Sequence, residues 1–461
     1  MTPMALTYKE HAKATLKLGL PLILGNLAQF AIHMTDTIML GWYDVTALAA
    51  ATIATSLFFV TFILGAGFAQ AVTPLVAAAS EAGDDTTVRR ATRMGLWLSI
   101  FYGAVIMIPF FWSEPILLAI GQTPEVAAEA HRYLVIVAIQ MVPMLIGMVL
   151  RSFLVAVEHA AIILWATIGA AVLNVAVNYA LIFGNWGAPE MGIQGAAVAS
   201  LVVTLVSTAI LLAYALKVLP QYDLLRNPLR PDPQIMSRVF RLGWPIGLTS
   251  LAEGGLFSAS AVMMGWIGEI PLAAHGIAIQ LASLTFMVHI GLSQAATVRA
   301  GRALGRDDEK GLRDAGKVGI ALSLAFALAT VAVFLSLPEL LISSFLDPDE
   351  PARDAVLQTG VVLLALAALF QVVDAAQVMA LGLLRGVQDT RVPMVIATIS
   401  YWIIGLPVSY VLAFPLELGG PGLWLGLVVG LTFAAVLLHW RFWTRSVHIT
   451  KGAPAAAPDP V

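Results

Sequence analysis

Three carboxylic acids lie inside long apolar segments of this chain, where an ionised side chain is costly. They are Asp36, Glu253 and Asp374, and a charge at the centre of a membrane-spanning helix costs about 2.5–3.5 kcal/mol. No Lys or Arg is expected at comparable depth, so no basic side chain of this chain is available for a salt bridge. We therefore expect these acids to take up protons, to bind metal cations or to face a cationic ligand.

The first acid has polar neighbours at a matching depth. Asn174 and Asn178 are four residues apart, so they share one face of a helix. Counting from the predicted span ends at about 1.5 Å per residue puts both asparagines, Asp36 and Ser200 in the outer half of the membrane. This arrangement predicts an oxygen-rich cation or proton site. Hydrogen bonding between helices is the alternative explanation for the two asparagines.

The segment around Asp36 also carries a polar stripe. Asn26, Gln29, His33 and Asp36 follow one another at spacings of 3, 4 and 3 residues, which places them on one helix face. This face should point into the bundle or towards a cavity. His33 lies one turn from Asp36 and could modulate its proton affinity, or it could simply donate a hydrogen bond.

The second half of the chain contains another polar cluster. Glu253 lies near the centre of its predicted span, and Gln371 and Asp374 lie one turn apart near the centre of another. Gln280 and Ser283 add further oxygen atoms. We predict that Glu253 and Asp374 form a second cation-binding pair.

The composition indicates an integral membrane protein. Hydrophobic residues make up 59% of the 461 residues and charged residues 11%, which is about half the usual charged fraction of soluble proteins. The absence of cysteine excludes disulfides and thiol chemistry. A membrane span needs about 20 apolar residues. We predict twelve spans, at about 15–41, 46–74, 88–112, 129–156, 160–184, 192–217, 238–267, 272–304, 314–338, 355–385, 392–414 and 421–445.

The chain repeats itself at an offset of 224 residues. The segment 17–21 (Lys-Leu-Gly-Leu-Pro) recurs as 241–245 (Arg-Leu-Gly-Trp-Pro), and 39–42 (Met-Leu-Gly-Trp) recurs as 263–266 (Met-Met-Gly-Trp). Six spans in each half is an even number, so the halves should share one orientation. The predicted fold is all-α, with twelve transmembrane helices in two six-helix lobes related by a parallel internal repeat.

The basic residues indicate the orientation. The loops that follow the odd-numbered spans lie on the side opposite to the N-terminus. Of the 25 Lys and Arg, only Arg132 and Arg353 fall on these loops. By the positive-inside rule, both termini should be cytoplasmic in a multi-pass protein of the inner (plasma) membrane. The expected organisation is a cytoplasmic N-terminus (1–14), an N-lobe (15–217), a cytoplasmic linker (218–237), a C-lobe (238–445) and a disordered tail (446–461).

Taken together, these residues resemble the multidrug and toxic compound extrusion (MATE) family. The similarity covers about 17–445, and its specific motifs lie at 34–41, 174–179, 251–255, 274–280, 373–377 and 385–393. The presence of both Glu253 and Asp374 resembles the NorM branch. The loop at 157–161 lacks the Arg and Pro of its counterpart at 385–393, so this loop pattern holds in one half only.

The resemblance implies efflux of flat, mostly cationic organic compounds in exchange for Na⁺ or H⁺, with two lobes that alternate around a V-shaped cleft. It leaves the coupling ion open. Na⁺ could bind at Glu253 with Asp374, or at Asp36 with Asn178, and the same groups could carry protons. No other cofactor is expected. The expected partners are small organic cations and the lipid bilayer, without nucleic acid, and the protein should be a monomer because one chain holds both repeats.

Three other functions agree less well with the sequence. A lipid-linked precursor flippase of the same superfamily should carry basic residues in its cleft to hold pyrophosphate, whereas acids are expected here. An intramembrane enzyme could use Glu253 and Asp374, but the chain has no HExxH motif and no cofactor fingerprint. A passive channel would not need twelve spans in two repeated halves.

Overall fold

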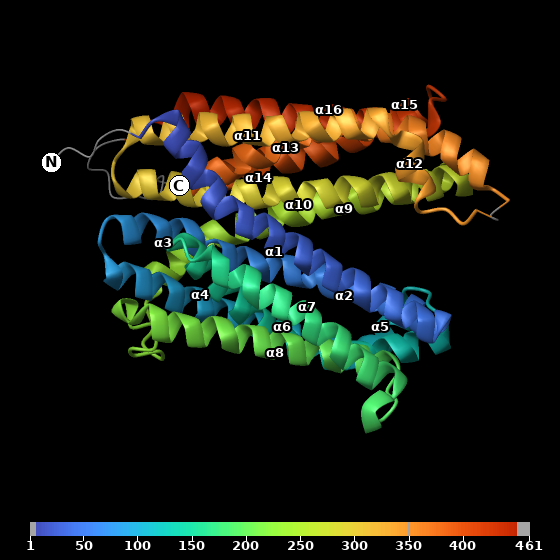
Figure 1. Cartoon of the computed structure of the whole chain (residues 1–461), viewed down its shortest axis with the longest axis horizontal. Helices are drawn as coiled ribbons and strands as arrows, with labels where there is room; N and C mark the ends of the chain where they lie inside the picture. Colours follow the sequence, from blue (N-terminus) through green and yellow to red (C-terminus); the bar gives the residue numbers. More distant parts are fainter. Residues whose placement is uncertain (1–5, 349–350, 450–461) are drawn as a thin grey trace. The chain divides into compact units, whose positions relative to one another are not determined.

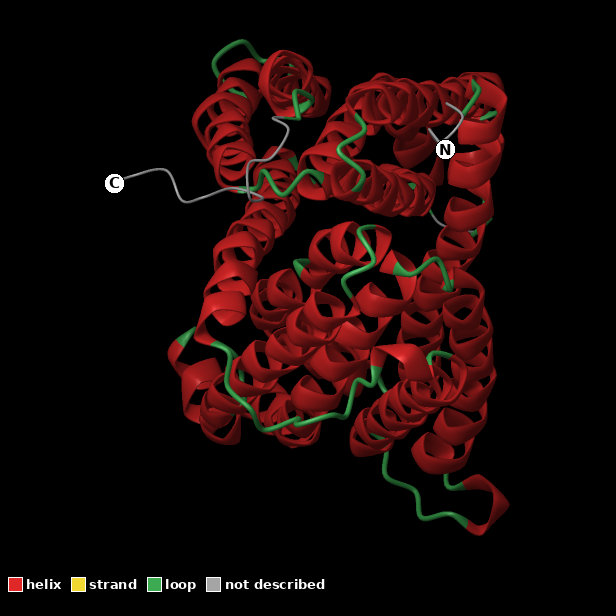
Figure 2. Ribbon diagram, turned by 90° about the vertical axis from the view of Figure 1, so that its left-hand side faces the viewer, coloured by secondary structure: helices red, strands yellow, loops and turns green. Residues whose placement is uncertain are grey.

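The computed structural model describes residues 6–348 and 351–449, and this part of the chain contains helices and loops without any strand (Figure 2). The predicted disordered tail lies outside the described residues from position 450 onwards. In the first half the helices are α1 (Tyr8–Tyr43), α2 (Val45–Gln70), α3 (Val72–Glu81), α4 (Asp85–Ile106), α5 (Ser113–Ala119), α6 (Pro124–Ala156), α7 (Ala160–Phe183) and α8 (Ile193–Val218). In the second half they are α9 (Pro233–Ile267), α10 (Glu269–Gly305), α11 (Glu309–Ser336), α12 (Pro338–Ser343), α13 (Arg353–Gly386), α14 (Arg391–Thr398), α15 (Leu406–Ala413) and α16 (Gly419–Arg441).

Twelve helical segments of the described chain are long and apolar enough to cross a membrane, which confirms the predicted fold. Several spans combine shorter elements. The second continues from α2 into α3, and the eleventh joins α14 to α15 through the π-helix η4 (Ile399–Gly405). The seventh begins at Pro233, five residues before its predicted start, because Asp232 caps the helix through the Ile235 amide and Pro233 suits the first helical position.

The chain divides into two compact units, and the divisions fall inside two long helices. One unit contains residues 1–23 and 248–461, and the other contains residues 24–247. Helix α1 is therefore split after Ile23, two residues beyond Pro21, and α9 is split after Gly247, two residues beyond Pro245. The N-terminal end of each helix belongs to the unit formed by the other half of the repeat.

Glycines allow the N-terminal ends of α1 and α9 to pack closely within the unit of the other half. A Cβ atom at Gly67 of α2 would lie 2.4 Å from the Gly243 carbonyl oxygen and 2.5 Å from the Gly247 nitrogen, both on α9. In the other unit, a Cβ at Gly291 of α10 would lie 2.8 Å from the Ile23 nitrogen on α1. Gly67 and Gly291 are equivalent in the 224-residue repeat. The same close helix contact is thus made once in each unit.

The helices of each unit run side by side along its length (Figure 1). In the unit with residues 24–247, α6 packs against α2 and α8 around fully buried Leu134, Met141 and Leu145. In the other unit, α13 packs against α10, α11 and α16. Fully buried Trp424 of α16 donates a hydrogen bond to His275 of α10. Helix α13 is therefore central in its unit, which buries the acid that it carries.

Candidate functional site

Asp36 of α1 accepts two hydrogen bonds from α7. The side-chain amides of Asn174 and Asn178 donate to its Oδ1 atom at 2.9 Å and 2.6 Å. The Asn178 amide also donates to Asn174 Oδ1 at 3.3 Å. Both asparagines are completely buried. The structure thus brings together three residues that the sequence placed at one depth, and the carboxylate receives donors at one of its oxygens.

The other polar residues expected near Asp36 differ in their placement. Ser200 of α8 is a further hydrogen-bonding neighbour of the carboxylate, and His33 precedes Asp36 by one turn of the same helix. The His33 side chain is exposed and has no hydrogen bond of its own in the described chain. Gln29 makes no hydrogen bond to this cluster within the described residues. The structure therefore assembles Asp36, Asn174, Asn178 and Ser200, with Gln29 outside the group.

A second cluster forms around Asp374 of α13. Asp374 is 1% exposed, and Gln371 and Gln377, one turn to either side of it, are completely buried. Gln371 donates to the Ala282 carbonyl of α10 at 3.2 Å, and Gln377 donates to the hydroxyl of Tyr401. Glu253 of α9 approaches from another helix, near enough that the two acids would repel each other if both were ionised.

This second cluster is rich in acceptors and poor in donors. Four buried oxygens in it have no hydrogen-bond partner among the described residues, namely Glu253 Oε1, Gln371 Oε1, Asp374 Oδ1 and Gln377 Oε1. Each unsatisfied buried acceptor costs about 1–3 kcal/mol. A proton or a small cation would satisfy such oxygens, because oxygen atoms are the ligands that hard cations prefer.

Sequence reasoning missed three residues of this cluster. Gln377 and Tyr401 connect α13 to the π-helix η4, and Arg385 acts on Glu253 through its charge. Gln377 could have been predicted, because it lies one turn from Asp374 and so shares a helix face with it. Arg385 lies in the last turn of α13, away from the polar residues that the sequence grouped around Asp374. Tyr401 had no such signal, since its position depends on η4, and π-helical turns are frequent at functional sites.

Gln280 and Ser283, which were also expected here, form no hydrogen bond to the cluster within the described chain. No group of three or more His, Cys, Asp or Glu side chains that could hold a metal ion occurs among residues 6–348 and 351–449. A cation at either cluster would therefore depend on amide or hydroxyl oxygens in addition to carboxylates.

An apolar cavity of about 720 Å³, open to the outside and lined largely by exposed side chains, lies between α1 and α7, the helices that carry Asp36 and its two asparagines. Its lining includes the aromatic side chains of Trp42, Tyr179 and Trp186. Tyr179 and Trp186 contact each other edge to face, with ring centroids 5.3 Å apart. Such a wall can hold an apolar or cationic organic molecule, because aromatic faces attract cations.

Comparison with known proteins identifies the family. The MatE family model matches residues 21–180 and 245–411. The chain is 46% identical to the probable multidrug resistance protein NorM of Rhizobium meliloti over 454 residues, which cover 98% of this chain and 97% of the relative. It is 36% identical to the multidrug resistance protein NorM of Burkholderia vietnamiensis over 97% of this chain and 96% of the relative.

Solved structures share the fold. A crystal structure of MATE in complex with MaL6 has a TM-score of 0.86 and 21% sequence identity, over 95% of this chain and 96% of that one. The eukaryotic MATE transporter AtDTX14 has a TM-score of 0.83 and 20% identity, over 95% of this chain and 98% of that one. The matched residues include both halves of the repeat and all three intramembrane acids, and the chain belongs to the MatE family.

Proposed function

We propose that the protein is a multidrug efflux transporter that exports cationic or amphipathic organic compounds in exchange for Na⁺ or H⁺. The relatives named as multidrug resistance proteins cover nearly the whole chain, so the proposed function concerns both halves of the repeat. The observation that carries the coupling part of the proposal is the donor-poor cluster of Glu253 and Asp374, with four unpartnered buried oxygens.

The two clusters would couple ion flow to export. A Na⁺ ion or proton at Glu253 and Asp374 would serve as the missing partner of these acceptor oxygens and would neutralise negative charge there. At Asp36 the amides of Asn174 and Asn178 already stabilise the carboxylate at Oδ1, so an ion that approaches this oxygen would compete with those hydrogen bonds. Alternating access of the two halves would expose each acid to one side of the membrane at a time.

The substrate class follows from charge and shape. The acids favour cations, and the apolar cavity between α1 and α7 offers aromatic walls for a flat organic molecule. We propose an inner (plasma) membrane location with both termini in the cytoplasm, from the distribution of the basic residues. We propose a monomer because one chain holds both repeats. The related flippases would need basic groups to hold pyrophosphate, whereas both clusters are built on carboxylates.

The test is efflux of ethidium from membrane vesicles with an imposed Na⁺ gradient and, separately, an imposed pH gradient. One of the two gradients should accelerate efflux, and a response to neither would contradict antiport. Glu253→Gln and Asp374→Asn should abolish the acceleration at normal expression levels. Glu269→Gln, an exposed acid in the first turn of α10, is the matched control. If both cluster variants transport at the wild-type rate, the coupling site is wrong.

A further inference from the structure

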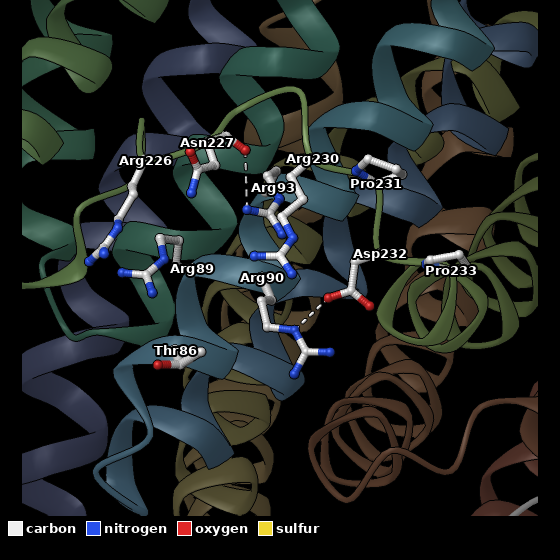
Figure 3. Close-up of a pocket in the computed structure, with 10 residues that line it drawn as sticks. All are labelled: Thr86, Arg89, Arg90, Arg93, Arg226, Asn227, Arg230, Pro231, Asp232 and Pro233. Atoms are coloured by element: carbon white, nitrogen blue, oxygen red, sulfur yellow. Dashed lines mark hydrogen bonds and ion pairs between the residues drawn. The ribbon is translucent and has the colours of Figure 1, made fainter.

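A second cavity, of about 520 Å³, lies between the start of α4 and the segment that connects α8 to α9, outside both carboxylate clusters. Five arginines and a single acid are among the residues that line it (Figure 3). They are Arg89, Arg90 and Arg93 on α4, and Arg226, Arg230 and Asp232 on the connecting segment. Such an excess of positive charge around one cavity predicts an anionic ligand.

The acid of this cavity is already engaged. Asp232 forms an ion pair with Arg90, whose guanidinium donates to the carboxylate, and it also accepts from the Ile235 amide. Arg226 lies 3.9 Å from Asp223. Neither Arg89 nor Arg230 has a carboxylate within ion-pair distance among the described residues. The cavity therefore retains positive charge that no acid of the described chain neutralises.

Arg93 shows most directly that an acceptor is missing. Its side chain is 7% exposed, and its guanidinium donates to the Asn227 carbonyl at 3.3 Å. Its Nε atom is buried without a hydrogen-bond partner. A guanidinium has five N–H donors, and a buried charge is costly unless it is paired. A phosphate group fits this requirement, because its several oxygens accept parallel hydrogen bonds from guanidinium groups.

The surroundings of the cavity indicate that the phosphate belongs to a lipid. Arg89, Arg93, Trp97 and Phe101 follow one another at intervals of four residues on one face of α4. Trp97 is 37% exposed and Phe101 69% exposed, and Leu229 on the connecting segment is 80% exposed. Charge, indole and apolar surface thus succeed one another in the order of a phospholipid's headgroup, interface and acyl chain. A free phosphate ion would not need this apolar surface.

We propose that this cavity binds the phosphate group of an anionic phospholipid in the leaflet that faces the basic side of the protein, which the expected topology makes cytoplasmic. Trp97 donates to the Pro228 carbonyl, so the connecting segment is already tied to α4 beside the cavity. A bound lipid would strengthen this tie at the point from which α9 starts. The proposal is independent of the transported substrate and of the coupling ion.

The test measures lipid binding to the purified full-length protein by native mass spectrometry, with phosphatidylglycerol, phosphatidylcholine and inorganic phosphate as probes. The informative variant is Arg89→Gln/Arg230→Gln, because neither side chain is fully buried. The matched control is Arg313→Gln/Lys317→Gln, which removes two charges at the repeat equivalents of Arg89 and Arg93. The single variant Arg230→Gln, on the connecting segment, provides a second test in case the double variant misfolds.

Wild type and control should bind phosphatidylglycerol equally well and phosphatidylcholine more weakly. The double variant should bind phosphatidylglycerol about 30-fold more weakly than wild type, from two basic side chains at a membrane surface. The single variant should lose about 5-fold. Equal retention of phosphatidylglycerol by wild type and both cavity variants would overturn the proposal. If inorganic phosphate displaces phosphatidylglycerol at comparable concentration, the site binds free phosphate and the lipid assignment is wrong.

Discussion

Replacing Glu253 with glutamine should stabilise the ion-free protein while it weakens the protein's response to the coupling ion. Glu253 Oε1, Asp374 Oδ1 and Gln377 Oε1 are buried without donors. A glutamine amide would bring an N–H donor into the same space and would remove one buried charge. Since an unsatisfied buried acceptor costs about 1–3 kcal/mol, one new hydrogen bond should stabilise the ion-free state by about that amount.

The measurement is the thermal unfolding of purified protein followed by tryptophan fluorescence, for which the chain has 11 tryptophans. For a protein of this length the gain corresponds to a rise in melting temperature of about 1–3 °C without Na⁺ and at high pH. Saturating Na⁺ or lower pH should then stabilise the wild type, by about 2.7 kcal/mol when the ion is at 100 times its dissociation constant. The Glu253→Gln variant should be stabilised less than wild type by Na⁺ or by lower pH.

The control for this experiment is Glu269→Gln, which should melt like wild type and keep the full increment because Glu269 is exposed. Two results would refute the reasoning. One is a Glu253→Gln variant that melts below wild type in the ion-free buffer, which would mean that the acceptors are satisfied in another way. The other is an unchanged ion increment, which would place the coupling ion away from this cluster.

Three further predictions concern other parts of the chain. Asp36→Asn should abolish gradient-driven efflux with little change in melting temperature, because an asparagine can still accept the two amide hydrogen bonds; undiminished efflux would limit this acid to packing. Gly67→Ala should destabilise the protein by about 1–3 kcal/mol, since its Cβ would meet backbone atoms, whereas Gly169→Ala, in open space, should not lower the melting temperature; equal melting of both variants would contradict the close helix contact. The guanidinium of Arg90 holds the pKa of Asp232 below its usual value, so the ion pair stabilises the protein above the unfolded-state pKa near 4 and is lost as the pH falls through the lower folded-state value. Asp232→Ala should therefore lower the melting temperature by about 1–2 °C at pH 7, and this difference should shrink below about pH 4; a difference that stays constant with pH would exclude the ion pair as its cause.

The fold could be predicted because its determinants are local. Membrane spans are recognised by apolar length, and the twelve helices follow from that property alone. The group around Asp36 could also be predicted, since counting residues from span ends gives depth, and Asn174 and Asn178 share a helix face. These are one-dimensional properties of the chain, and the structure adds the hydrogen-bond distances.

Other features depend on which helices pack against each other, and the local sequence does not determine this packing. Gly67 and Gly291 are recognisable as repeat equivalents, but the sequence does not say that each lies against the N-terminal end of the other half's first helix. Tyr401 reaches Gln377 from a π-helix, whose extra residue per turn moves side chains to positions that the α-helical period does not predict. Gln280 and Ser283 illustrate the converse, because polar residues on the correct span do not necessarily point towards the cluster.

The internal repeat provides two similar helical frameworks that hold chemically different clusters. Asp36 corresponds to Ser260, and Glu253 corresponds to Gln29, so equivalent helices place their acids two turns apart. The Asp36 carboxylate receives two amide hydrogen bonds at Oδ1, and its cluster keeps one unpartnered buried oxygen, Asn178 Oδ1, whereas the Glu253 and Asp374 cluster keeps four among the described residues. An arriving ion therefore meets one oxygen of the first acid already engaged by two donors, whereas at the second cluster it meets four oxygens that have no partner. We expect loss of Asp36 to affect mainly the charge that its cluster carries. Loss of Glu253 or Asp374 should affect mainly the uptake of the coupling ion.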